Sequence, residues 1–306
     1  MSIPMKLACA AVRLTRTKQH YRSKAWMRAE YLQRSYPVQA PVSRSVRKLC
    51  TVEESMVGGF RTVTLRPRSE SSDASIIYLH GGTYINELVR PHWSIIAELI
   101  RRTGATVTVP FYPLAPEHTF GEAFEYLETV YARVLETAAS DDVVLAGDSA
   151  GGGLSVGMAL HLQAAGLPRP GRLLLLSPWA DITGTNPELP AYEKVDPMLA
   201  IPGAVEAGSW WAGKEDPRHP LLSPVYAPAA DLALLPPVDI HQGERDMCMP
   251  DAAKLAARIN DAGGTAALTA YPGAFHVFMA LPWLPESKAV YDDVERVVRT
   301  TSGERR

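Results

Sequence analysis

The chain has 306 residues, of which 46% are hydrophobic and 21% charged, and its formal net charge is −2. This composition is typical of a globular protein and excludes a disordered or strongly basic chain, so we expect no nucleic-acid partner. The length is sufficient for one large α/β core with an appendage.

Positive charge is concentrated near the N-terminus. Residues 1–48 contain eleven Lys and Arg against one acid, Glu30, so this segment carries +10 and the rest of the chain −12. We interpret it as a basic helical segment over an acidic body, with weak contact with an anionic membrane surface as the alternative. The apolar run "LACAAV" is too short for a signal peptide. The three scattered cysteines, Cys9, Cys50 and Cys248, indicate neither a disulfide framework nor a zinc site, so we expect a cytoplasmic location.

Short apolar runs alternate with longer segments of helical period along most of the chain. Strands are expected at "KLCTVEE", "FRTVTLRP", "SIIYLH", "ATVTVPF", "VVLAG", "RLLLLSP", "VDIHQG" and "TAALTAYP". Helices are expected over 93–102, 120–137, 152–165, 252–262 and 286–299, with Gly104, Gly166 and Gly263 after three of them. The alternation predicts a mostly parallel sheet with helices on both faces, in which the first two strands form an antiparallel hairpin.

The segment from about Asp181 to Leu235 interrupts this alternation. It is rich in proline and contains "AVEAGSWWAG". A loop of this length without structure is uncommon in a compact domain, so we expect an insertion that folds over the ends of the strands. Trp210 and Trp211 are adjacent and cannot both face one pocket, so core packing is the predicted role of this pair.

The stretch "VVLAGDSAGGGLSV" places Ser149 between a buried strand and a helix, within the pattern G-x-S-x-G. At such a strand-to-helix turn the pattern predicts a nucleophile elbow, in which Gly147 and Gly151 are small because side chains there would collide with neighbouring backbone. The alternatives are a glycine-rich turn capped by serine and a phosphate-binding nest. This stretch has no lysine at the position where a phosphate-binding loop of the G-x-x-x-x-G-K-[ST] type carries one, which disfavours the nest.

A serine nucleophile needs a base and an orienting acid later in the chain. His276, in "YPGAFHVF", follows the last predicted strand and is the predicted base. Asp246, in "ERDMCMPDA", follows the strand "VDIHQG" and is the predicted acid. Glu244 is the weaker alternative, Asp251 is expected at a helix N-terminus, and Asp148 is too close to Ser149 along the chain to serve.

Acyl transfer also requires hydrogen-bond donors for the oxyanion that forms in the transition state. The stretch "IIYLHGGTY" offers the amides of Gly81, Gly82 and Thr83 on a loop after a buried strand. The amide of Ala150, next to the serine, is the further predicted donor.

With these residues the chain resembles the hormone-sensitive-lipase-like family of α/β-hydrolases, in particular bacterial acetyl-hydrolases and carboxylesterases. The resemblance runs from about Lys48 to the C-terminus and includes, in order, "HGGTY", "YPLAPEHTF", "GDSAGGGL", "RDMCMPDA" and "FHVFMALPWLP". It implies an α/β-hydrolase fold with an eight-stranded sheet, a triad of Ser149, Asp246 and His276, a helical cap, and no metal or organic cofactor. The implied organisation is an N-terminal cap segment (1–45), a catalytic domain (46–180 and 236–306) and a cap insertion (181–235).

We therefore predict a serine carboxylesterase or acetyl-hydrolase that cleaves small-molecule, short-chain acyl esters. An N-deacetylase or acyltransferase of a secondary metabolite would use the same triad and stays an alternative. A non-catalytic receptor is a remote one, because such a protein is expected to lack a triad member. A homodimer is left open.

Thr83 departs from the family pattern, in which many members carry a third glycine at this position. The amide is retained, but the β-branched side chain is expected to narrow the pocket. Replacement of Thr83 by glycine is expected to admit bulkier esters and to lower stability, because glycine has more freedom in the unfolded chain.

Overall fold

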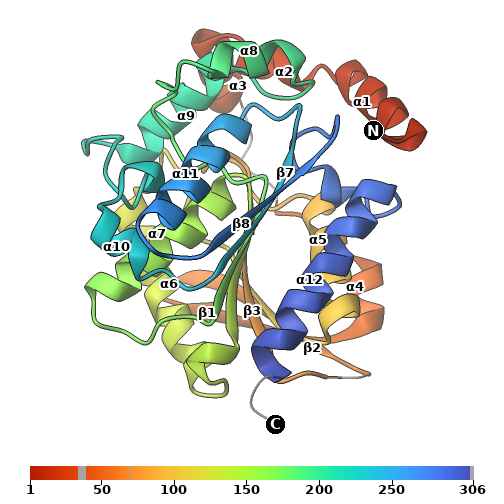
Figure 1. The fold of residues 1–306 in the computed structure, drawn as a ribbon, viewed down its shortest axis with the longest axis vertical. Coiled ribbons are helices and arrows are strands. Elements are labelled where there is room, and N and C mark those ends of the chain that lie inside the picture. Colours follow the sequence, from red (N-terminus) through yellow and green to blue (C-terminus); the bar gives the residue numbers. More distant parts are fainter. Residues whose placement is uncertain (34–38, 70, 304–306) are drawn as a thin grey trace.

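A computed structural model of the chain describes residues 1–33, 39–69 and 71–303 (Figure 1). One sheet has eight strands in the order β1-β2-β4-β3-β5-β6-β7-β8. The strands are β1 (Cys50–Val57), β2 (Phe60–Pro67), β3 (Ser75–Leu79), β4 (Thr106–Pro110), β5 (Val143–Asp148), β6 (Arg172–Leu176), β7 (Val238–Gly243) and β8 (Ala266–Tyr271). The β2 strand runs antiparallel to β1 and β4, and the other neighbours pair in parallel. The predicted fold class and the N-terminal hairpin are thus confirmed.

Helices cover both faces of this sheet (Figure 1). One face carries α4 (Arg44–Leu49), α5 (Arg90–Thr103) and α12 (Pro285–Gly303). The other carries α6 (Phe120–Leu135), α7 (Ala150–Ala164), α10 (Ala229–Ala233) and α11 (Met249–Asp261). The five helices predicted from the sequence correspond to α5, α6, α7, α11 and α12, with ends that differ by at most four residues. Gly104, Gly166 and Gly263 follow three of them with positive φ, as expected for helix C-termini.

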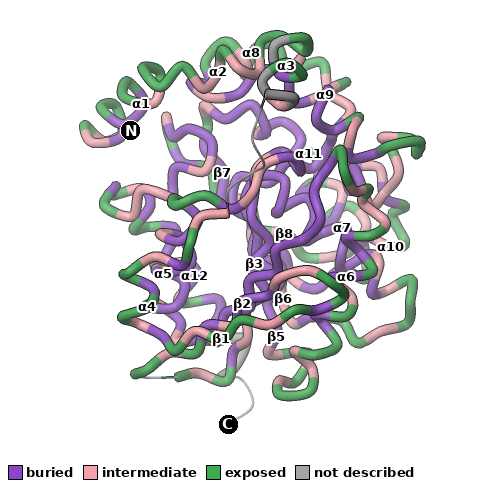
Figure 2. Tube along the Cα trace, turned by 180° about the vertical axis from the view of Figure 1, so that it is seen from behind, coloured by how far each residue is buried: buried purple, intermediate pink, exposed green. Residues whose placement is uncertain are grey.

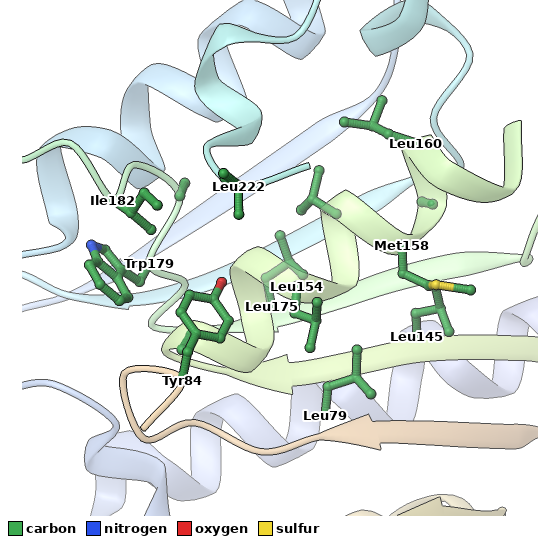
Figure 3. Packing of buried hydrophobic residues seen from close by; sticks show 14 of the residues in the cluster. Leu79, Tyr84, Leu145, Leu154, Met158, Leu160, Leu175, Trp179, Ile182 and Leu222 are labelled. Carbon is green, nitrogen blue, oxygen red and sulfur yellow. The ribbon is translucent and has the colours of Figure 1, made fainter. Parts of the chain in front are cut away.

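The core consists of two layers, one on each face of the sheet. Along β6, Leu173 and Leu175 belong to the layer under α6, α7 and α11, whereas Leu174 and Leu176 belong to the layer under α5 and α12. Figure 3 shows Leu175 in the first of these layers, beside α7, and Figure 2 shows the strands buried at the centre of the molecule. A strand buried on both faces needs apolar residues at its buried positions, which explains the four leucines that follow Arg172 in "RLLLL".

Five more helices lie beyond the carboxyl ends of the strands (Figure 1). They are α1 (Ile3–Leu14), α2 (Thr17–Tyr21), α3 (Lys24–Gln33), α8 (Leu189–Val195) and α9 (Ile201–Ala212). Buried Glu206 of α9 forms an ion pair with Arg28 of α3, lies 3.8 Å from Lys24 Nζ, and accepts a 3.0 Å hydrogen bond from Trp210 Nε1. The basic N-terminal segment is therefore attached to the insertion through a buried acid.

The remainder of the insertion, from residue 213 onward, returns to the face covered by α7 and α11. Arg258 of α11 donates a 2.9 Å hydrogen bond to the carbonyl of Ala227. Trp211 is fully buried and stacks on Tyr84 with ring centroids 4.5 Å apart, in agreement with the predicted packing role. The division of the chain into cap and catalytic segments stays a prediction, and residues 34–38 of the proposed cap segment lie outside the described residues. Within the described residues, no helix is both long enough and apolar enough to cross a membrane.

Candidate active site

Ser149 occupies the sharp turn that joins β5 to α7. Its backbone has φ 53° and ψ −121°, a conformation that non-glycine residues adopt at a cost of about 1–3 kcal/mol. A Cβ on Gly147 would collide with the carbonyl of Gly151, and a Cβ on Gly151 would collide with the carbonyl of Leu79. The predicted reason for both glycines is therefore confirmed, and the close packing holds the serine in its strained conformation.

His276 and Asp246 reach Ser149 from two other loops at the same edge of the sheet. His276 Nε2 lies 2.8 Å from Ser149 Oγ, and His276 Nδ1 lies 2.9 Å from Asp246 Oδ2. All three side chains are buried. Because the carboxylate can only accept, Nδ1 carries the proton and Nε2 is left to accept the serine hydroxyl proton. The structure thus brings together all three residues that the sequence singles out for the triad.

The competing acids lie elsewhere. Glu244 is exposed and accepts a 3.3 Å hydrogen bond from the amide of Gly273. Asp251 lies in the first turn of α11, as predicted, and accepts a 2.7 Å hydrogen bond from Asn186 Nδ2. Of the acids that the sequence offered, only Asp246 has a hydrogen bond to His276.

Asp148 does not orient His276. It holds the loop after β3 in place. Its Oδ1 accepts hydrogen bonds from Tyr78 Oη at 2.5 Å and from the Gly81 amide at 3.0 Å, and its Oδ2 lies 3.3 Å from His92 Nε2. Burial raises the pKa of Asp148, but the interactions with His92, Tyr78 and Gly81 outweigh it, so the pKa is lowered overall.

His80 also holds this loop in place. Burial lowers the pKa of His80 to about 4, so its neutral ring donates from Nδ1 to the carbonyl of Gly81 at 2.7 Å.

This network corrects one predicted role. The amide of Gly81 was expected to bind the oxyanion, but it already donates to the Asp148 carboxylate. The amides of Gly82, Thr83 and Ala150 donate to no other group of the described chain. Gly82 and Thr83 both have positive φ, of 129° and 54°. These three amides are therefore the ones left to bind an oxyanion, and the bond from Gly81 to Asp148 holds the loop in place.

A cavity of about 410 Å³ opens beside Ser149 and His276. This volume is in the range of sites that bind small molecules. Most of its lining is apolar: Val12 lies on α1, and Met198 and Leu199 follow α8 in the insertion. These lining residues belong to no sequence motif, so sequence analysis could not identify them.

The electrostatics of the site raise the pKa of the predicted base. Burial lowers the pKa of His276, but the carboxylates of Asp246, Asp196 and Asp148 raise it by more, so its pKa lies above the usual value of 6.5. The same carboxylates would stabilise the imidazolium that forms when His276 takes the serine proton.

Asp246, Cys248 and His276 place potential metal-ligand atoms within 4.8 Å of one another. Two of these residues already bond to each other within the triad. Burial and the nearby carboxylates raise the pKa of the Cys248 thiol.

Thr83 provides a first test of the pocket. It lines the cavity, its backbone has φ 54°, and its hydroxyl donates a 2.7 Å hydrogen bond to the carbonyl of Gly82. We predict that Thr83→Gly raises the ratio of kcat/KM for a tertiary-alcohol ester to that for the matching primary-alcohol ester, because the β-branched side chain is removed. The structure changes the expected effect of Thr83→Gly on stability. Glycine releases about 1–2 kcal/mol of left-handed backbone strain, which offsets its larger loss of conformational entropy on folding. A melting temperature near that of the wild type should result.

Thr83→Ser is the matched control, because it keeps the hydroxyl and removes only the methyl group. It should raise the ratio less than Thr83→Gly does. If both kcat/KM values fall in Thr83→Gly while their ratio stays constant, Thr83 shapes only the loop and does not limit the pocket.

The fold and this site define an α/β-hydrolase in which the Ser149 hydroxyl is hydrogen-bonded to His276. Residues 76–280 match the model of a family described as having the alpha/beta hydrolase fold. An acetyl-hydrolase from Streptomyces hygroscopicus is 31% identical over 250 residues, which cover 81% of this chain and 82% of that protein. The chain therefore belongs to this α/β-hydrolase family, and it is a hydrolase of the carboxylic-ester class.

Solved structures agree with this assignment. The esterase EstE5, soaked with p-nitrophenyl butyrate, has a TM-score of 0.85 and 28% identity, with 98% of this chain and 99% of that chain covered. An esterase from the bacterial hormone-sensitive lipase family has a TM-score of 0.82 and 25% identity, with 99% of each chain covered. The resemblance noted in the sequence motifs is thus confirmed.

Proposed function

We propose that this chain is a serine carboxylesterase that cleaves short-chain acyl esters through an acyl-enzyme. Ser149 Oγ attacks the ester carbonyl carbon while His276 Nε2 takes its proton, and Asp246 holds the imidazole in the required tautomer. The amides of Gly82, Thr83 and Ala150 stabilise the oxyanion. His276 then returns the proton to the leaving alcohol, and a water molecule releases the acid from Ser149 by the same steps.

The observation that carries this proposal is the hydrogen-bonded series Ser149–His276–Asp246 at the wall of a mostly apolar cavity. A cavity of about 410 Å³ suits a short acyl chain and a small alcohol better than a long-chain lipid. The soak of EstE5 with p-nitrophenyl butyrate supports an ester of this size as the first substrate to test.

A panel of p-nitrophenyl esters of increasing acyl length, run beside an N-acetylated amine, tests the proposal. We expect acetyl and butyryl esters to give the highest kcat/KM and longer chains to be poorer substrates. Faster turnover of the N-acetylated amine would favour the N-deacetylase alternative, and product formation only with an added alcohol would favour the acyltransferase. Binding of esters without turnover would favour the non-catalytic receptor.

We also propose that α1, α2 and α3 form a cap over the site together with α8 and α9. Support comes from the lining of the cavity, to which α1, α2 and the insertion contribute. The α3 helix joins this group through the ion pair of Arg28 with Glu206 of α9. The cytoplasm stays the proposed location, since Cys9, Cys50 and Cys248 are buried free thiols.

The outward face of α1 supports the proposed contact with an anionic membrane surface. Ile3, Leu7 and Leu14 lie on one side of this helix and are 72%, 66% and 83% exposed. Lys6 and Arg13 flank this stripe, are exposed, and form no ion pair with the described residues. The opposite face packs on the body through Met5, Ala8 and Cys9. An exposed apolar stripe beside unpaired cations is the pattern of helices that lie on anionic lipid surfaces.

We predict that the protein co-sediments with phosphatidylcholine vesicles that contain phosphatidylglycerol, and much less with phosphatidylcholine alone. The double variant Leu7→Ser and Leu14→Ser should lower the partition coefficient at least about tenfold. Lys6→Glu should lower it several-fold and added salt should do the same. Met56→Ser together with Leu234→Ser, which replaces exposed apolar residues elsewhere, is the control and should bind as the wild type does. Equal binding to both vesicle types would contradict the preference for an anionic surface. A dimer that the stripe variant dissociates would mean that the stripe binds a second copy of the chain and not a membrane.

A further inference from the structure

The insertion places a second buried carboxyl beside the triad. Asp196, which directly follows α8, is only 2% exposed. Its Oδ1 accepts hydrogen bonds from the amides of Met198 at 2.6 Å and Leu199 at 2.9 Å. Its Oδ2 accepts a 2.7 Å hydrogen bond from the amide of Met247. One side chain thus bonds to two segments that are about fifty positions apart in the sequence.

These two segments are both parts of the site. Met198 and Leu199 line the cavity beside Ser149. Met247 follows Asp246 directly, and the next amide, that of Cys248, donates a 2.8 Å hydrogen bond to Asp246 Oδ1. The loop that carries Asp246 is therefore held on one side by its own turn and on the other by Asp196.

Asp196 also acts on the site through its charge. Burial, together with the charge of Asp246, raises the pKa of Asp196, while His276 and the amides of Met198 and Leu199 lower it. In the other direction, the negative charge of Asp196 raises the pKa of His276. Among the described residues, the titratable groups that interact with Asp196 through charge are Cys9 of α1, Lys18 of α2, Asp246 and Cys248 after β7, and His276 after β8. Glu193 of α8 acts on Lys18.

Lys18 contributes to the same arrangement without neutralising the carboxylate. Its Nζ donates to the main-chain carbonyls of Glu193 and, at 2.7 Å, of Asp196. The contact connects α2 to the end of α8, so the N-terminal helices help to set the position of Asp196.

We propose that Asp196 is a positioning residue of the catalytic triad, which fixes the Asp246 loop through the Met247 amide and supplies a second negative charge that acts on His276. The inference rests on the proposed esterase function, and it extends the triad by one residue from the insertion. It accounts for why the chain keeps a carboxylate buried next to another carboxylate, although burial and the like charge both oppose its ionisation.

The test is the pH dependence of kcat/KM for a short-chain p-nitrophenyl ester in Asp196→Asn. Activity requires neutral His276, so it falls as the pH drops through the pKa of this residue. Removal of the Asp196 charge should move this acid limb to lower pH by about half a unit or more. Asparagine has one carboxamide oxygen in place of two carboxylate oxygens, so the Met247 amide loses its acceptor. The less firmly held Asp246 loop should lower kcat by roughly tenfold to a hundredfold. NMR titration of His276 should show the same shift of pKa without reference to activity.

Asp251→Asn is the matched control, because Asp251 is also a buried carboxyl with a raised pKa but bonds to Asn186 instead of the triad loop. It should leave the acid limb in place. Asp196→Glu, which keeps the charge, should retain the wild-type limb even where kcat is reduced. If Asp196→Asn does not fold, Asp196→Ser keeps a hydroxyl acceptor, removes the charge and should show the same shift.

The outcomes separate this inference from the proposed function. If the wild type hydrolyses esters but both neutral variants keep its acid limb and its His276 pKa, the inference about Asp196 is overturned. An equal shift in Asp251→Asn would overturn it as well, because the effect would then not depend on contact with the triad loop. If the wild type hydrolyses no ester, the proposed function fails, while the NMR titration still tests the effect of Asp196 on His276.

Discussion

Ser149→Ala is expected to abolish ester hydrolysis, with kcat reduced by about 10⁶, because loss of a triad nucleophile commonly has an effect of this size. His276 Nε2 lies 2.8 Å from Ser149 Oγ, and alanine leaves this base without a proton to accept. The oxyanion amides and the cavity remain, so any residual rate would come from binding and electrostatics alone. The measurement is kcat on p-nitrophenyl acetate for the two proteins.

The fold of this variant should be intact. Ser149 makes its backbone contacts through main-chain atoms: its amide donates to the carbonyl of Leu176, and its carbonyl accepts from the amide of Trp179. Alanine keeps both bonds, so the melting temperature should change little. Retention of more than a small fraction of activity in a folded variant would mean that Ser149 is not the nucleophile.

Asp246→Asn is expected to lower kcat by about 10⁴, as replacement of the orienting acid does in other triads. Asp246 accepts two hydrogen bonds, from His276 Nδ1 at 2.9 Å and from the Cys248 amide at 2.8 Å. Asparagine has one oxygen for these two donors, and an amide group that faces His276 would donate to Nδ1. The ring would then carry its proton on Nε2, which could no longer accept the proton of Ser149.

The control for this prediction is Asp251→Asn. Burial raises the pKa of Asp251 to about 6, and its hydrogen bond to Asn186 lies away from the base. The variant should alter stability and leave kcat within a small factor of the wild type. Comparable losses of kcat in the two variants, both checked for folding by circular dichroism, would mean that Asp246 has no special role.

Much of the fold and of the triad is encoded locally and could therefore be predicted. A strand buried on both faces requires an unbroken apolar run, so "RLLLL" indicated a central strand before any neighbour was known. The turn at Ser149 admits only glycine at 147 and 151, so the pattern G-x-S-x-G predicted the geometry of the turn. His276 and Asp246 each follow a strand, and the ends of parallel strands meet at one edge of the sheet.

Other features depend on partners that are remote in the chain, and only the tertiary structure decided them. The amide of Gly81 was a plausible oxyanion donor until Asp148, sixty-seven positions away, proved to be its acceptor. The strain at Thr83 arises from a positive φ, which the neighbouring residues in the sequence do not predict. Asp196 reaches Met247 because α8 and the loop after β7 pack together, although fifty-one positions separate the two residues. Periodicity and local motifs report on a residue's own element, whereas the partner of a buried polar group is set by how distant elements pack.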